Sequence, residues 1–222
     1  MDWRQALGFY DKLTAEQQSL LAANITERTA QAGEMVHQGG AACDGLLLVK
    51  DGQLRTFTVS EQGRAITLYR LFSLDMCLFS ASCVMRSIAF DISVQAEQQT
   101  IYWHIPAGVY QPLMQQSAAV ANYTNEVMAT RFSDVMWLLD QILNKKLDAR
   151  LAAFLLEESA LEQSGTLAIT HEMIAEHLGS AREVVTRMLR YLKAEGLVEL
   201  ARGTVKIADA ARLQALAGDS LR

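Results

Sequence analysis

The sequence has few of the residues that break a folded chain or keep it flexible. Only 2 of its 222 residues are proline and 13 are glycine, and no stretch is rich in glycine and serine. Apolar residues make up 50% of the chain. Because disordered segments are poor in apolar residues and flexible linkers are low in complexity, these features predict compact, continuous structure. At roughly one domain per ~150 residues, the length favours two modest domains.

The chain also lacks a long apolar run and has little cysteine. No uninterrupted apolar segment approaches the ~18 residues of a membrane span. The first residues, MDWRQALGFYDKLTAEQQSL, do not combine a basic start with an apolar run as a secretory signal does. We therefore expect a cytoplasmic protein without a membrane partner. Three cysteines, Cys43, Cys77 and Cys83, form an odd set, which argues against a disulfide framework and favours reduced, semi-buried thiols.

An excess of positive charge is missing from the chain as a whole, because the net charge is −5 at pH 7. The deficit lies in residues 1–144, which hold 9 Lys/Arg and 14 Asp/Glu, whereas residues 145–222 hold 11 of each. Nucleic-acid binding needs local positive charge rather than a basic total. The acidic total therefore does not exclude a DNA-binding C-terminal part.

Short apolar or alternating runs fill the chain from Gly33 to about Pro106. They are GLLLVK, LRTFTV, AITLYRLF, AFDISVQA and TIYWHI, and they are separated by QGG, KDGQ and SEQGR. Short strands with glycine turns predict an antiparallel sheet, sandwich or barrel. The Asp51-Gly52 pair is the strongest hairpin signal in this part.

The period of the apolar residues changes in the middle of the chain. From about Leu113 to Leu143 there is no Pro or Gly, and apolar residues recur at three- and four-residue steps, which predicts one long amphipathic helix. Its near-heptad spacing favours pairing with a second copy, with packing on its own domain alone as the alternative. The predicted dimer interface consists of Val120, Thr124, Met128, Phe132, Val135, Leu139 and Ile142.

The last third of the chain has the pattern of a winged helix-turn-helix. After the helix NKKLDARLAAFLLEES, Thr170 fits the N-cap of a short helix that runs to about His177. Gly179 suits a left-handed turn, a second helix covers 181–194, and Gly196 opens a hairpin, LVEL-ARGT-VKIA. Helix, glycine turn, helix and hairpin follow one another as they do in that fold.

The second of these helices keeps its charged side chains away from its core face, which is formed by Val185, Met188, Leu189 and Leu192. In a helix-turn-helix its first turns enter the major groove, where Arg can donate two hydrogen bonds to guanine and Glu can accept one from cytosine. Later residues of the helix, and the hairpin, are better placed for phosphates. The predicted DNA-binding residues are Arg182, Glu183, Thr186, Arg187, Arg190, Lys193, Arg202 and Lys206. The alternative is that these are ordinary solvated charges on an amphipathic helix, with no role in DNA binding.

The β-rich first half, the long helix and the C-terminal GSAREVVTRML together resemble the CRP/FNR family of bacterial transcription regulators over nearly the whole chain. Arg182, Glu183 and Arg187 match that family's recognition-helix pattern. The resemblance implies an α+β chain with an antiparallel β-roll sensor of the cyclic-nucleotide-binding type, a long dimerisation helix and a winged helix-turn-helix. We place these parts at 1–108, 109–144 and 145–222. The family likeness also implies a homodimer on palindromic double-stranded DNA with GTGA-like half-sites, and RNA polymerase as a further partner.

The sequence departs from the family where cyclic nucleotides bind. Nucleotide-binding members carry Gly-Glu and, about ten residues later, Arg followed by Ser or Thr. Matching back from SVQAE puts Phe79-Ser80 and Phe90-Asp91 at these places. A Phe cannot pair with a phosphate and an Asp would repel it, so cyclic AMP is not the expected effector. The family's oxygen sensor binds an iron–sulfur cluster through N-terminal cysteines, which residues 1–42 lack.

The cofactor and the signal therefore stay unidentified. Cys77 and Cys83 lie six apart in MCLFSASCVM, a predicted loop, and could form a redox-sensitive pair or bind a soft metal. Two buried thiols that pack as small apolar groups are the plainer reading. A haem bound by His37, His104 or a cysteine is a further alternative.

An enzyme is not expected. In HEMIAEH, His171 and His177 are six residues apart and roughly 240° around a helix, whereas zinc proteases need two histidines four apart on one face. A Gly-rich phosphate loop and a serine nucleophile elbow are both missing from the sequence. A winged-helix module that contacts protein without binding DNA is the remaining alternative.

Overall fold

The computed structural model describes residues 2–39, 45–78 and 92–221. The chain forms two compact units. Unit 1 consists of Met1–Thr58 and Leu68–Val135, and unit 2 consists of Val59–Thr67 and Met136–Arg222. The division into three parts with boundaries after residues 108 and 144 stays a prediction.

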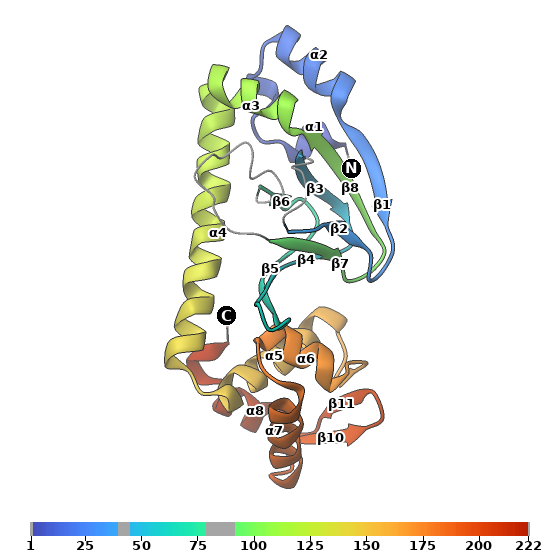
Figure 1. The fold of residues 1–222 in the computed structure, drawn as a ribbon, viewed down its shortest axis with the longest axis vertical. Helices are drawn as coiled ribbons and strands as arrows, with labels where there is room; N and C mark the ends of the chain where they lie inside the picture. Colours follow the sequence, from blue (N-terminus) through green and yellow to red (C-terminus); the bar gives the residue numbers. More distant parts are fainter. Residues whose placement is uncertain (1, 40–44, 79–91, 222) are drawn as a thin grey trace. The chain divides into compact units, whose positions relative to one another are not determined.

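Unit 1 contains two four-stranded sheets (Figure 1). Their strand orders are β1-β8-β3-β6 and β2-β7-β4-β5, and the strand pairs with a described register run antiparallel. Side chains from both sheets, among them Leu47 and Val49 of β3 and Leu54 of β4, share one apolar cluster. This confirms the predicted antiparallel β fold. The strands are β1 Thr26–Ala30, β2 Met35–His37, β3 Gly45–Asp51, β4 Leu54–Val59, β5 Ala65–Leu71, β6 Met76–Cys77, β7 Ser93–Ala96 and β8 Thr100–Pro106.

The Asp51-Gly52 turn does not close a hairpin, so this prediction was wrong. β3 and β4 follow one another in the chain but belong to different sheets, and β3 pairs with β8 and β6 instead. Gly52 has a φ of +98°, and a Cβ on it would lie 2.6 Å from the carbonyl oxygen of Gln99. The glycine thus allows a tight turn against a neighbouring loop. A turn signal predicts a change of direction, but the pairing partner depends on which strands share a face of the core.

The helices of unit 1 pack with the first sheet in a second apolar cluster that includes Phe9, Trp103, Tyr110 and Val120. The predicted single helix from Leu113 to Leu143 is in fact two helices. Ser117, with φ −118° and ψ 113°, separates them, because its N–H closes the first helix on Leu113 and its carbonyl accepts from Ala121 in the second. The elements are α1 Trp3–Ala6, the 3₁₀-helix η1 Tyr10–Lys12, α2 Ala15–Asn24, α3 Ala107–Gln116 and α4 Ala118–Asn144. The last part of α4, from Met136 on, belongs to unit 2.

Unit 2 is a helical domain with a small sheet of strand order β10-β11-β9, which confirms the predicted winged helix-turn-helix. Its core joins Leu151 and Leu155 of the first helix to Ile174, Val185 and further apolar residues of the later elements. The end of the β4–β5 hairpin belongs to this unit too. The elements are α5 Leu147–Glu162, β9 Thr166–Leu167, α6 His171–Leu178, α7 Arg182–Ala194, β10 Val198–Ala201, β11 Thr204–Ile207, α8 Ala210–Ala217 and the 3₁₀-helix η3 Gly218–Ser220.

In the described part of the chain, none of the helices combines the length and the hydropathy needed to span a bilayer.

Candidate DNA-binding surface and sensor region

Three features stabilise α6 and the turn that joins it to α7. The Oγ1 atom of Thr170 accepts a hydrogen bond from the N–H of Met173 and so caps α6, as predicted. At the other end Gly179 adopts the left-handed conformation, with φ +64°. From α5, the Nη2 atom of Arg150 donates to the carbonyl of Leu178 at 2.7 Å. Gly179 and the Arg150 contact thus define the turn from which α7 begins.

The α7 helix divides cleanly into a buried and an exposed face. Val185, Leu189 and Leu192 are fully buried in the core of unit 2. The charged residues on the remaining faces, which the sequence assigned to DNA, are all exposed: Arg182, Glu183, Arg187, Arg190 and Lys193. Because the apolar face is already covered, the charged residues form the accessible surface of the helix.

Two of the predicted DNA-binding residues interact with the first turn of α6. The Nε atom of Arg182 lies 3.8 Å from a carboxylate oxygen of Glu172, and both side chains are more than half exposed, so this ion pair is weak and easily exchanged. Thr186 is half-buried, and its Oγ1 atom lies 2.9 Å from Nδ1 of His171. Thr186 therefore positions α6 against α7.

His171 was not among the predicted DNA-binding residues. The sequence gives its place at the start of α6, but His171 and Thr186 are 15 positions apart in the chain, and only the crossing of the two helices creates their contact. Burial, and after it the charges of Arg182 and Arg190, lower the pKa of His171 below its ordinary value of 6.5. His177, the second histidine of α6, is buried and lies 2.9 Å from the Oγ1 atom of Thr67.

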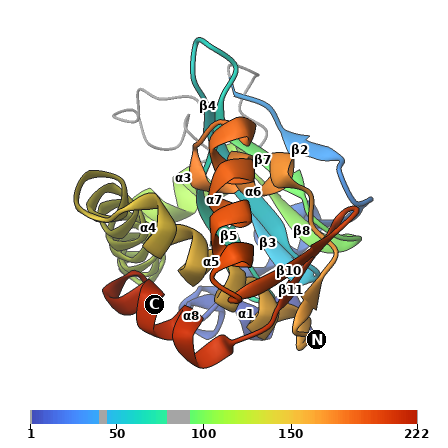
Figure 2. The ribbon, with the colours of Figure 1, turned by 90° about the horizontal axis from the view of Figure 1, so that it is seen from below.

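The β10–β11 hairpin projects from unit 2 beside α7 (Figure 2). Its turn contains Arg202, which is exposed, and Gly203, whose φ of +72° suits a glycine. Lys206 is exposed as well, and its Nζ atom lies 3.1 Å from a carboxylate oxygen of Glu199 in a surface ion pair. Both predicted wing cations thus remain within reach of solvent.

The α4 helix buries one side and leaves an apolar stripe on another. Val120 and Thr124 are only 0% and 3% exposed, because they pack inside unit 1, where Thr124 bonds the hydroxyl of Tyr110 at 2.8 Å. They are therefore not available to a second copy, and the predicted interface needs this correction. Met128 and Val135 are half-buried against the unit 1 core. The large exposed apolar residues of α4 are Phe132, Met136, Leu139, Ile142 and Leu143.

The predicted sensor residues are only partly described. Cys77 lies in strand β6 and not in a loop, and it is fully buried in the apolar cluster that also contains Tyr69. His37 of β2 and His104 of β8 are buried as well. The remaining sensor positions, Cys43, Cys83, Phe79-Ser80 and Phe90-Asp91, lie outside the described residues.

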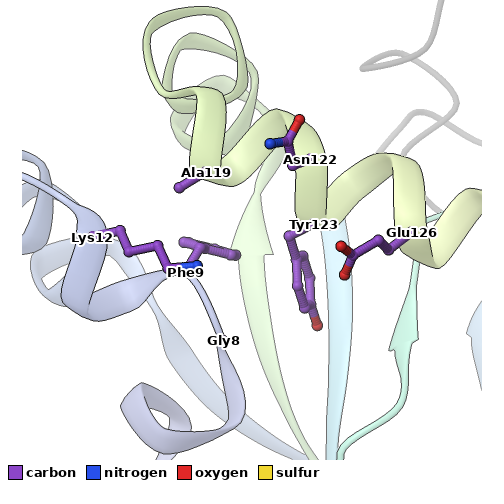
Figure 3. A pocket seen from close by; sticks show the side chains of 7 residues that line it. All are labelled: Gly8, Phe9, Lys12, Ala119, Asn122, Tyr123 and Glu126. Atoms are coloured by element: carbon purple, nitrogen blue, oxygen red, sulfur yellow. The ribbon is translucent and has the colours of Figure 1, made fainter.

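A half-open cavity of about 520 Å³ lies between the N-terminal segment and the first turns of α4. Figure 3 shows the rings of Phe9 and Tyr123 side by side in it, with their centroids 5.1 Å apart. Lys12 and Glu126 stand at opposite ends of the row of lining side chains. No sequence pattern predicts this cavity, because it joins segments more than a hundred residues apart.

Comparison with known proteins agrees with this geometry. A model of the cyclic nucleotide-binding domain matches residues 27–117, and a model of the Crp-like helix-turn-helix domain matches residues 149–216. A solved structure of a CRP/FNR-family transcriptional regulator from Eubacterium rectale is 54% identical, covers 96% of this chain and 99% of its own, and superposes with a TM-score of 0.94.

Two curated relatives are more distant. The transcriptional activator protein Anr of Pseudomonas aeruginosa is 27% identical over 87% of this chain and 81% of its own length. The cyclic AMP receptor protein of Thermus thermophilus is 26% identical over 92% of this chain and 94% of its own. Proteins of this group are transcription regulators rather than enzymes, and they bind DNA and act as dimers. With a cyclic nucleotide-binding domain, a helix-turn-helix whose charged face is open and a solved relative more than half identical, this chain belongs to the CRP/FNR family of transcription regulators.

Proposed function

We propose that the chain reads palindromic DNA with GTGA-like half-sites through α7. The observation that carries this proposal is the exposed set Arg182, Glu183 and Arg187 on a helix whose opposite face is buried. Arg can donate two hydrogen bonds to guanine and Glu can accept one from cytosine, so the first turns suit a half-site that contains G·C pairs. Arg190 and Lys193 lie further along the helix, and together with Arg202 and Lys206 they suit phosphates.

The α4 stripe supports a symmetric dimer. Phe132, Met136, Leu139 and Leu143 follow one another at steps of four, three and four residues, which is the a/d spacing of a two-stranded coiled coil. Phe132 and Leu143 are 66% and 69% exposed in the single chain. A second copy would cover these side chains and would present a second α7 to the other half-site.

The sequence of the first unit bears on the signal to which this regulator responds. We propose that it is not cyclic AMP, because the sequence offers Phe90 and Asp91 where nucleotide-binding members offer Arg and Ser or Thr to the phosphate. By family likeness, the dimer works in the cytoplasm together with RNA polymerase and has no catalytic activity of its own.

Fluorescence anisotropy with a labelled duplex tests the DNA proposal. The dimer should bind a palindrome of two GTGA half-sites, with centres about one helical turn apart, at least 10³-fold more tightly than a scrambled duplex of equal composition. Equal affinity for both duplexes would contradict the proposed GTGA-like half-site. No binding to either would leave a winged-helix module that contacts protein only.

A further inference from the structure

We propose that His171 contacts a DNA phosphate beside α7 and takes up a proton as it does so, which makes DNA binding by this regulator proton-linked. The proposal rests on the DNA binding proposed above and adds to it a residue and a chemical step. His171 is the first residue of α6 and is half-buried, so part of the residue reaches solvent.

Its position follows from one hydrogen bond. Arg182, Thr186 and Arg190 are spaced four residues apart and therefore share one side of α7. Thr186, the middle member, lies 2.9 Å from Nδ1 of His171. The imidazole of His171 thus lies beside Thr186, with Arg182 one helical turn before Thr186 and Arg190 one turn after it. Since Nδ1 is engaged by Thr186, Nε2 is the ring atom left to donate to an anion.

Burial, and after it the charges around the ring, disfavour the imidazolium in the free protein. The cations that face it are Arg182 and Arg190 of α7, and both disfavour a third positive charge. On α6 itself, Glu172 lies next to His171 in sequence but is paired with Arg182. A DNA phosphate close to this row would neutralise the guanidinium charges and supply an acceptor for Nε2–H. The pKa of His171 then rises. At a pH between its free and its bound value, one proton moves from solvent to the His171 ring for each half-site.

The sign of the pH dependence follows. The pKa of His171 lies below 6.5 in the free protein and rises when the phosphate is bound. Between these two values the complex holds a proton that the free protein lacks, so affinity falls as the pH rises through this window. Because the dimer holds two such residues, the fall is up to about tenfold per pH unit for each half-site.

The test is anisotropy with the full-length dimer and a palindromic duplex from pH 5.5 to 8, at constant ionic strength. Wild-type affinity should fall with rising pH. His171→Gln should flatten this dependence, and His171→Arg should bind tightly at every pH, with a steeper salt dependence by about one counterion per half-site. Met173→Gln, an exposed position on the same helix, is the matched control and should keep the wild-type slope.

Each outcome decides something. A pH-independent wild type that still prefers its palindrome would overturn the role of His171 and leave the proposed function standing. A His171→Gln variant that keeps the slope would assign the proton to another group, and a His171→Arg variant that folds but binds more weakly at pH 8 would contradict a phosphate contact. A wild type that binds no DNA at any pH would contradict both the proposed DNA binding and the proposed role of His171.

Discussion

At the scale of single residues, α7 carries on one short helix both the residues that we propose for base readout and those that we propose for phosphate contact. Arg182 and Glu183 lie in its first turn, and Arg190 lies eight residues later, about 12 Å along the axis. A contact near the start of the helix meets base edges, whereas one near its end meets the sugar–phosphate backbone. The two groups should therefore leave different signatures in binding data.

Replacing Arg182 or Glu183 by Ala should cost ~1–3 kcal/mol of binding free energy on the preferred site and relax the preference at one base pair of each half-site. Replacing Arg190 or Lys193 should instead weaken binding to all sequences alike, and should lower the slope of log affinity against log salt by roughly one per half-site. Titrations of specific and random duplexes at several salt concentrations measure both effects. A uniform loss for Arg182→Ala would show that this residue does not read bases.

Gly179 supports the same surface from the backbone. Its φ of +64° is costly for any residue with a Cβ, by roughly 1–2 kcal/mol. A Cβ at Gly179 would also lie 2.6 Å from the Cδ1 atom of Ile66, so Gly179→Ala should lower the stability of unit 2 by at least that amount. Gly165→Ala, where an added Cβ would meet open space, should cost less. Thermal or denaturant unfolding of the two variants gives the comparison. Equal stabilities would mean that the turn tolerates another backbone conformation.

At the scale of elements, α4 has a buried side that packs in unit 1 and an exposed apolar stripe that we propose for dimerisation. Its buried side ties it to unit 1, where Arg131 pairs with Asp75 at 2.8 Å and with Asp134 at 3.0 Å. Its exposed stripe carries apolar residues in heptad spacing. A helix that served only its own unit would not need such a stripe, since large exposed apolar surfaces on a single chain mark interaction sites.

Changing both Phe132 and Leu143 to Glu should convert the dimer to a monomer. In a symmetric seam each new carboxylate meets its own copy, and unpaired buried charge costs several kcal/mol. Sedimentation velocity measures the change, and palindrome binding should weaken with it. Thr130→Glu with Ser133→Glu adds the same charge at exposed positions outside the stripe and should stay dimeric. A dimeric Phe132 and Leu143 variant would place the interface elsewhere.

At the scale of the whole molecule, a signal that binds the regulator would change the stability of the folded chain. A ligand that binds only the folded state must raise the melting temperature by mass action. Cyclic AMP at millimolar concentration should leave the melting temperature and the DNA affinity unchanged, because Phe90 and Asp91 replace the expected phosphate partners. A cyclic-nucleotide-binding member of the family serves as the positive control. A shift of several degrees would overturn the assignment of these two positions.

The sequence alone determined much of the fold, because its strongest signals are local. A capping threonine, a left-handed glycine and a 3.6-residue apolar period set the ends and the buried face of α6 and α7, and Thr170 and Gly179 lie where these rules put them. The same locality explains why the charged face of α7 could be predicted. Once the core positions are assigned, the remaining side chains must face outward.

Only the tertiary structure decided which elements meet. Gly52 marks a turn, but the pairing of β3 with β8 depends on strands some fifty residues away. Val120 and Thr124 fit the apolar period of α4, yet they belong to its buried side, since a period leaves open which side a sheet will cover. His171 lies beside Thr186 only because two helices cross at the Gly179 turn. Contacts between distant residues follow from packing, and packing depends on the whole chain at once.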